Sequence, residues 1–162
     1  EYLLSKKQAE NQLSSNHFIA STIVSTPMIK ALAEEYQIQF KNCLTGFKWI
    51  AKLIEDHPEL TFVGGGEESF GYMVGDFVRD KDAVTSALLA CEIAAAAKAG
   101  GSSFYETLLE LYTKHSFYKE RLVSFTKKGG INRSRSFSRL EIPRRLWVSI
   151  SATSAASMVS HN

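Results

Sequence analysis

The residues best suited to chemistry are two acids and a hydroxyl that follow three consecutive glycines, in the segment VGGGEESFGY at 63–72. Glycine can turn through positive φ and lets a ligand approach the backbone closely, so 64–66 predict a tight loop beside a bound molecule. In an extended segment, Glu67 and Ser69 would point the same way and offer acceptors and a donor suited to hydroxyl groups. Because carboxylates repel anions, this set fits a sugar better than a phosphate. The alternative is a glycine-rich surface turn whose acids are only solvated.

The composition is that of one globular domain, since 44% of the 162 residues are apolar. Cys43 and Cys91 lie in apolar runs, which favours buried free thiols and a reducing compartment. The first residues lack the features of a signal peptide, and the longest apolar stretch, 87–97, is too short to cross a bilayer. We therefore expect a cytoplasmic protein with no membrane segment.

Charge is distributed unevenly along the chain. Residues 1–128 carry 14 Lys and Arg against 16 Asp and Glu, whereas residues 129–162 carry five Arg against one Glu. The arginines of 129–162 are interleaved with serines and lack the aromatic spacing of a nucleic-acid stacking platform. Nucleic acid is therefore not expected as a partner.

The order of apolar segments predicts a layered α/β fold. The first 16 residues read as the end of a helix that runs into a polar turn. Three segments rich in β-branched or alternating apolar residues predict strands, at 17–24, 37–44 and 60–63. Pro27 begins a helix between the first two strands, and 45–58 holds a helix between the second and third. These short connections predict a three-layer α/β/α domain with a mixed, largely parallel sheet of about four strands.

Three connections follow the carboxyl ends of the predicted strands, where parallel sheets bind ligands. They contain Ser25 and Thr26, then Thr45 and Gly46, then the segment 67–69. We therefore expect three loops that are distant in the sequence to meet at one edge of the sheet.

Beyond the glycines, a dense charge cluster at 76–82 precedes an alanine-rich helix over 83–98. Four residues share one apolar face of this helix: Val84, Leu88, Cys91 and Ala95. Ser103 and Glu106 match a capping box for a further helix that ends near His115. The segment 118–126 is compatible with a short strand that leads out of the domain.

Three segments carry a family pattern in their order and spacing: TGFKWI at 45–50, GGGEESFG at 64–71 and GDFVRDKD at 75–82. Together they resemble the third domain of the α-D-phosphohexomutases, the phosphoglucomutase and phosphomannomutase family. The Gly-Glu-x-Ser element of that family's sugar-recognition loop is matched by residues 66–69. The similarity covers residues 15–128.

The resemblance implies an enzyme with four domains around a cleft, to which this chain contributes one. A phosphoserine of the first domain would transfer its phosphoryl group to a hexose phosphate, with a glucose or mannose 1,6-bisphosphate as activator. Mg²⁺ would be held by the second domain, and a phosphate-binding loop would come from the fourth. None of these motifs occurs in this sequence. The isolated chain is therefore expected to be inactive, with a hexose phosphate and the missing first, second and fourth domains as its partners.

Within the chain, the resemblance implies five substrate-binding residues: Glu67, Ser69, Gly66, Thr45 and Gly46. Lys81 matches a family lysine near the transferred phosphoryl group and would contact phosphate or take part in proton transfer. The four histidines are scattered without ligand spacing, so no metal site is expected in this chain.

Some neighbouring residues have plainer interpretations. Glu68 is interpreted as a solvated or structural carboxylate, Lys48 as solvated, and Arg79 as an ion-pair partner of Asp76 or Asp82. A stand-alone, non-catalytic α/β module that binds a sugar phosphate remains the alternative function.

The predicted organisation has three parts. Residues 1–15 are the end of an interdomain helix or linker, and 16–128 are the third domain with its sugar-binding loop. Residues 129–162 form an atypical basic tail with eight serines, where the family would place an acidic, helical linker. One hypothesis for this tail is a shifted reading frame or another artefact in the coding sequence.

Overall fold

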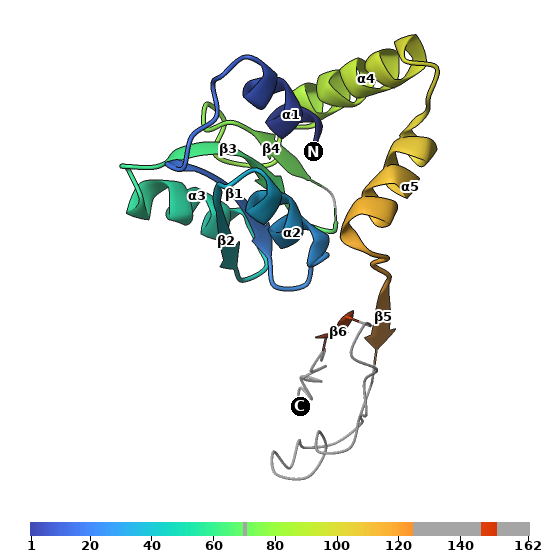
Figure 1. Ribbon diagram of the computed structural model, residues 1–162. Coiled ribbons are helices and arrows are strands. Elements are labelled where there is room, and N and C mark those ends of the chain that lie inside the picture. The colour runs from blue at the N-terminus through green and yellow to red at the C-terminus, as the bar shows by residue number, and fades with distance from the viewer. Residues whose placement is uncertain (70, 125–146, 152–162) are drawn as a thin grey trace, which may run out of the picture. The chain divides into compact units, whose positions relative to one another are not determined.

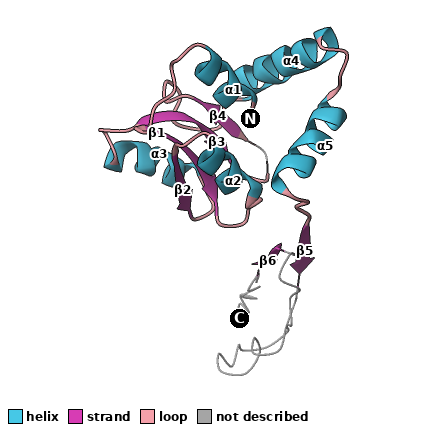
Figure 2. Cartoon of the chain, viewed as in Figure 1, coloured by secondary structure: helices cyan, strands magenta, loops and turns pink. Residues whose placement is uncertain are grey.

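The computed structural model describes residues 1–69, 71–124 and 147–151 (Figure 1). The chain divides into two compact units, Glu1–Tyr118 and Lys119–Asn162. The first unit holds the sheet and the five helices that Figure 2 colours by type. The basic tail predicted at 129–162 lies outside the described residues except for 147–151.

The first unit is built on a four-stranded sheet in the order β2-β1-β3-β4. Its strands are β1 (His17–Thr22), β2 (Gln39–Cys43), β3 (Thr61–Gly66) and β4 (Tyr72–Val74). β1 runs parallel to both β2 and β3, whereas β4 is antiparallel to β3. The prediction of a mixed, largely parallel sheet of about four strands is therefore confirmed.

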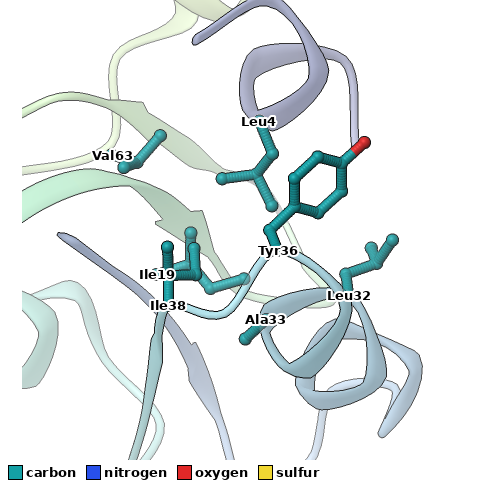
Figure 3. Close-up of a cluster of buried hydrophobic side chains, with 7 residues drawn as sticks. All are labelled: Leu4, Ile19, Leu32, Ala33, Tyr36, Ile38 and Val63. Atoms are coloured by element: carbon teal, nitrogen blue, oxygen red, sulfur yellow. The ribbon is translucent and has the colours of Figure 1, made fainter. Parts of the chain in front are cut away.

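Alternating residues of β1 and β3 build two separate cores on the two faces of this sheet. On one face, Ile19 and Val63 pack with α1 (Tyr2–Ala9) and α2 (Met28–Glu35), as Figure 3 shows. On the other face, Phe18 and Phe62 pack with α3 (Phe47–Asp56). Helices on both faces make the three layers that the sequence predicts.

Each face is completed by further buried side chains, most of them from helices. The first cluster adds Leu4, Leu32, Ala33, Tyr36 and Ile38. The second adds Ala20, Phe47, Ile50, Ile54 and Met73, with the Phe18 and Phe62 ring centroids 5.2 Å apart. Full burial of one such side chain contributes about 1.5 to 3 kcal/mol, so these two clusters supply most of the driving force for this unit.

The three consecutive glycines do not form the tight loop predicted from the sequence. They are the last three residues of β3, and positive φ among glycines is found at Gly46, Gly75 and Gly101 instead. A Cβ on Gly65 would lie 2.2 Å from the backbone oxygen of Ala20 on β1, and one on Gly64 would lie 2.6 Å from the Tyr72 hydroxyl oxygen. At Gly65 the neighbouring backbone leaves no room for a side chain, whereas at Gly64 the Tyr72 side chain would have to move.

Helix α4 (Ala83–Ala99) contradicts the predicted apolar face. Val84 and Leu88 are 78% and 68% exposed, and Cys91 is also exposed, so it is not the buried thiol expected from the sequence. The partly buried side of α4 instead includes Leu89 and Ile93. The alanines of α4 are distributed around its whole circumference, so the sequence pattern does not distinguish the inner face of the helix from its outer face.

Helix α5 (Phe104–His115) begins and ends where the sequence predicts. The Ser103 hydroxyl oxygen accepts a hydrogen bond from the Glu106 backbone N–H (3.3 Å), and the hydroxyl donates to Glu106 Oε2 (2.9 Å). At its other end, His115 Nε2 lies 2.8 Å from Glu35 Oε2, and Lys114 Nζ contacts the same carboxylate. The last turn of α5 is thereby fastened to the end of α2.

The second unit contains a parallel pair of strands, β5 (Glu120–Ser124) and β6 (Trp147–Ser151). A strand at 118–126 was predicted from the sequence, whereas β6 was not. Among the described residues, no single helix is long and apolar enough to cross a membrane. One pair of helices, α4 and α5, reaches that length and apolar composition only when the two are taken together, and they are bent by 84° relative to each other.

Candidate functional site

The carboxyl ends of β1, β2 and β3 lie side by side at one edge of the sheet. Thr22 at the end of β1 pairs with Cys43 at the end of β2, and Ser21 pairs with Gly66 at the end of β3. The Ile23 backbone N–H then donates to the Cys43 carbonyl oxygen (2.8 Å) just beyond the ladder. The three loops that follow therefore start from adjacent positions, as the sequence analysis expects.

Glu67 links the loop after β3 to the loop after β2. Its Oε1 accepts a hydrogen bond from the backbone N–H of Gly46, the residue that precedes α3. Gly46 has a φ of +119°, a conformation that residues with a side chain rarely adopt. A carboxylate at this position also interacts favourably with the positive end of the α3 dipole. The contact brings Gly46 and Glu67 together, while Thr45 is exposed beside them.

The charge of Glu67 also reaches the end of β2. Burial raises the pKa of the Cys43 thiol, and the Glu67 carboxylate raises it further. Cys43 Sγ donates to the Ser21 carbonyl oxygen over 3.5 Å. A raised pKa favours the neutral thiol form of Cys43, which is the less reactive one.

Glu68 joins the same loop to the end of β1. The Thr22 hydroxyl donates to Glu68 Oε2 (3.3 Å), and the Ser69 hydroxyl donates to Glu68 Oε1 (3.3 Å). Thr22 Oγ1 also lies 2.9 Å from Ser25 Oγ. Thr22 and Ser25 are only 2% and 8% exposed, whereas Glu68 is exposed. This geometry agrees with the interpretation of Glu68 as a structural carboxylate.

Lys81 lies against the turn between β3 and β4. A Cβ on Gly71 would come within 2.6 Å of the Lys81 Cβ and 2.7 Å of the Phe47 ring. Lys81 Nζ lies 5.7 Å from the centroid of that ring and 3.5 Å from Asp80 Oδ1. The ammonium group is exposed, so Lys81 offers a mobile positive charge next to the loop that carries Glu67.

The residues beside the turn have defined partners. The Glu67 N–H donates to the Gly71 carbonyl oxygen (3.3 Å), and the Ser21 hydroxyl donates to the Gly66 carbonyl oxygen (3.3 Å). Burial raises the pKa of Tyr72 to about 12, so its phenol stays neutral at physiological pH. Gly66 is thus a backbone position that holds the start of the loop against β1.

Two residues that the sequence analysis missed complete this edge, namely Thr22 and Phe47. Thr22 reads in the sequence as one more β-branched residue of a buried strand. Phe47 reads as a core residue of α3, yet its ring also supports Gly71 and Lys81. The signal for Thr22 is a hydroxyl placed at the carboxyl end of a central parallel strand.

Two neighbouring cations lie apart from these contacts. Lys48 is exposed, with its Nζ 5.4 Å from the centroid of the Trp49 ring, in agreement with the interpretation that it is solvated. The ion pairs formed by the described residues do not include the expected pairing of Arg79 with Asp76 or Asp82. Arg79 therefore has no structural assignment.

The arrangement provides carboxylate and hydroxyl groups on the loop after β3 and an exposed lysine on the segment before α4, while the Gly46 N–H of the loop after β2 is paired with Glu67. Carboxylates accept hydrogen bonds from hydroxyl groups, and an exposed ammonium group can interact with an anion. Among residues 1–69, 71–124 and 147–151, no three His, Cys, Asp or Glu side chains are grouped so that they could hold a metal ion. The described residues therefore offer no such group to Mg²⁺.

Asp82 anchors the charged segment 76–82 at the start of α4. Its Oδ2 accepts from the Thr85 hydroxyl (2.9 Å), and its Oδ1 accepts from the backbone N–H groups of Val84 (2.9 Å) and Thr85 (3.4 Å). The Thr85 hydroxyl is the main cause that lowers the pKa of Asp82 below its ordinary value of 3.8, and the two N–H groups add to it. Because folding lowers this pKa, ionised Asp82 stabilises the folded state at pH values above 3.8. This stabilisation is lost as the pH falls through the lowered pKa.

We predict that Asp82→Ala lowers the midpoint of urea unfolding at pH 7, because α4 loses its N-cap. The difference from the wild type should shrink as the pH falls below 3.8, since Asp82 then becomes protonated in both states. Asp76→Ala is the matched control, because Asp76 lies in the same segment but caps no helix. Equal unfolding midpoints for the wild type and Asp82→Ala at pH 7 would contradict the prediction.

Comparisons with known proteins identify the family of this fold. Residues 1–115 match the family described as phosphoglucomutase/phosphomannomutase, alpha/beta/alpha domain III. A phosphoglucomutase of Staphylococcus epidermidis is 34% identical over 128 residues, which are 78% of this chain and 23% of that protein. A phosphoglucomutase of Staphylococcus aureus is 36% identical over 125 residues, which are 75% of this chain and 22% of that protein. The chain therefore spans less than a quarter of the length of these relatives.

One solved structure supports the fold. A Thermus thermophilus protein assigned as a phosphomannomutase superposes with a TM-score of 0.55, over 72% of this chain and 25% of that one. At 20% sequence identity this similarity concerns the fold alone. The match over residues 1–115 and the curated relatives show that the chain belongs to the phosphoglucomutase/phosphomannomutase family and carries its α/β/α domain III.

Proposed function

We propose that this chain supplies the sugar-recognition loop of a larger phosphohexomutase. Such an enzyme moves a phosphoryl group reversibly between positions of a hexose phosphate. The observation that carries the proposal is the contact between Glu67 and Gly46, because it joins two family segments at the edge of the sheet. Lys81 comes from the third family segment and packs against the same turn.

In this proposal, Glu67 and Ser69 hold sugar hydroxyls, and Gly66, Thr45 and Gly46 complete the binding loop. A sugar that is phosphorylated at either end must bind in two orientations, and its hydroxyl groups can be hydrogen-bonded in both of them. Glu67 and Ser69 suit this task because neither group grips a phosphate. Lys81 contacts the phosphate or assists proton transfer from its exposed position.

The remaining parts of the reaction belong to the rest of the parent protein. The phosphoserine, the Mg²⁺ site and the fourth-domain phosphate loop are assigned to segments outside this sequence, and the activator is a glucose or mannose 1,6-bisphosphate. A cytoplasmic location for the parent stays a prediction from the sequence. The alternative is a stand-alone sugar-phosphate-binding module, which would rest on the contact of Gly46 with Glu67 within this one unit.

A binding experiment tests the proposed site. Glucose 1-phosphate titrated into the ¹⁵N-labelled chain should shift the backbone amides of 45–46 and 67–69 more than those of α4. The Glu67→Ala variant should lose these shifts, whereas Glu110→Ala, an exposed substitution on α5, should keep them. Shifts confined to other segments would reject the site.

We predict that the purified 162-residue chain has no mutase activity at any concentration of magnesium or glucose 1,6-bisphosphate. The physical reason is that no phosphoryl donor is assigned to this sequence, so sugar binding alone cannot move a phosphate. The measurement is a coupled assay of glucose 1-phosphate conversion, with a mock purification from the same host as its control. Turnover above that control, in proportion to the added chain, would contradict the prediction.

A further inference from the structure

The hydroxyl groups around Glu68 form a chain of hydrogen bonds whose direction can be derived. Both oxygens of the Glu68 side chain face hydroxyl groups, and a carboxylate accepts hydrogen bonds but donates none. Thr22 and Ser69 must therefore both give their protons to Glu68. Because the single proton of Thr22 is then used, Ser25 must be the donor in its 2.9 Å contact with Thr22. The chain runs from Ser25 through Thr22 to Glu68, and Ser69 joins it from the other side.

Donors and acceptors can be counted in the same way for the two residues that would hold the sugar. Ser69 has one proton, and this proton is directed to Glu68. Its oxygen keeps lone pairs for a ligand but has no proton to offer. Glu67 can only accept, and its Oε1 is already occupied by the Gly46 N–H. One oxygen of Glu67 and one of Ser69 thus remain available as acceptors.

Building on the proposed function, we infer that Thr22, Ser25 and Glu68 are positioning residues that fix Ser69 as a hydrogen-bond acceptor. The site then selects a sugar that donates two hydroxyl protons, one to Ser69 and one to Glu67. Thr22 and Ser25 belong to the end of β1 and its loop, and both are buried, so the direction of the chain is set from inside the domain. Glu68 connects these two buried hydroxyl groups to Ser69 on the loop after β3.

The inference separates two kinds of sugar analogue. A deoxyfluoro sugar has a weak acceptor in place of a hydroxyl, and a deoxy sugar has neither donor nor acceptor. If Ser69 and Glu67 only accept, both analogues lose the same hydrogen bond. At the two ring positions that contact the loop, each should then bind about tenfold more weakly than the parent sugar.

The Glu68→Gln substitution should change the relative affinities of the two analogues while keeping the size of the side chain. The Glu68→Gln amide can accept from Thr22 and donate to Ser69, which frees the Ser69 proton for the ligand. At the ring position facing Ser69, the fluoro analogue should then bind about threefold more tightly than the deoxy analogue. Thr22→Val should weaken binding of the unmodified sugar phosphate severalfold, whereas Thr22→Ser, which keeps the hydroxyl, should restore it.

The experiment uses the 162-residue chain and glucose 1-phosphate with its deoxy and deoxyfluoro analogues, measured by NMR titration. In parallel, the hydroxyl protons of Thr22 and Ser25 are measured in the sugar-free chain. Both should exchange slowly with water, and the Thr22 proton signal should shift in Glu68→Gln. A purely structural role for these residues would leave the ratio of fluoro to deoxy affinities unchanged by that substitution.

The outcomes distinguish the inference from the function on which it rests. Rapid exchange of the Thr22 hydroxyl, or a fluoro analogue that already binds better than its deoxy counterpart in the wild type, overturns the inference even if the sugar binds. Failure of glucose 1-phosphate to bind, with slow exchange and a shift of the Thr22 proton in Glu68→Gln, overturns the proposed function for this chain and upholds the direction of the hydrogen-bond chain.

Discussion

Replacing Gly65 by alanine is expected to prevent the first unit from folding. An added Cβ would lie 2.2 Å from the Ala20 backbone oxygen and 3.0 Å from its carbonyl carbon. Both atoms belong to β1, which is hydrogen-bonded to β2 on one side and to β3 on the other. No flexible side chain can move away to relieve the clash, so two central strands would have to separate.

The expected loss is large compared with the stability of a small domain. Overpacking of a core costs about 1 to 3 kcal/mol where side chains can adjust, and more where only backbone is available. Folded domains are stable by about 5 to 15 kcal/mol in total. Gly65→Ala should therefore abolish the cooperative urea transition followed by circular dichroism, or move it to a much lower urea concentration.

Gly100→Ala is the matched control for this experiment. The nearest atom to a Cβ at Gly100 is 3.5 Å away, and its φ of −81° suits any residue. Its unfolding midpoint should stay close to that of the wild type, because removing a glycine at a compatible position changes stability by less than about 1 kcal/mol. A Gly65→Ala chain that unfolds at the same midpoint as Gly100→Ala would show that β1 and β3 tolerate separation.

The sheet was largely predictable from the sequence, because its central strands differ in pattern from the helices between them. The buried run at 17–24 and the alternation at 37–44 both lead to strands. The short strand β4 was missed, since the three residues Tyr72–Val74 give no measurable period. The glycines of β3 were misread because glycine indicates either a turn or a close contact between strands, and only the neighbouring strand decides between them.

The site was predictable in outline and not in detail. Strand polarity alone places the loops after β1, β2 and β3 at one edge, and the contact between Glu67 and Gly46 agrees with that expectation. The partners of Glu68 were not predictable, because Thr22 is separated from it by 46 residues and resembles a core residue. The exposed face of α4 was mispredicted because an alanine-rich helix has no sequence pattern that favours one face.

The largest effect on function is expected from Glu67→Ala in the full-length enzyme that carries this domain. If Glu67 holds a sugar hydroxyl, the substitution removes a hydrogen bond to a charged group, worth about 1.5 to 3 kcal/mol. At about 1.4 kcal/mol per tenfold change, kcat/KM for hexose phosphates should fall by roughly ten- to a hundredfold. Ser69→Ala should cost less, because the hydroxyl makes a hydrogen bond without charge.

The structure adds a second consequence that must be separated from the first. Glu67→Ala also leaves the Gly46 N–H without its acceptor, so the start of α3 loses a stabilising contact. Glu67→Gln separates the two effects, because its amide oxygen can still accept from Gly46 while its charge is gone. The unfolding midpoint should then recover more fully than kcat/KM does. Glu110→Ala on α5 serves as the control for the loss of a glutamate, and it should change neither quantity. A Glu67→Ala enzyme with wild-type kcat/KM on both glucose and mannose phosphates would mean that Glu67 only fastens the loop to Gly46 and does not hold the sugar.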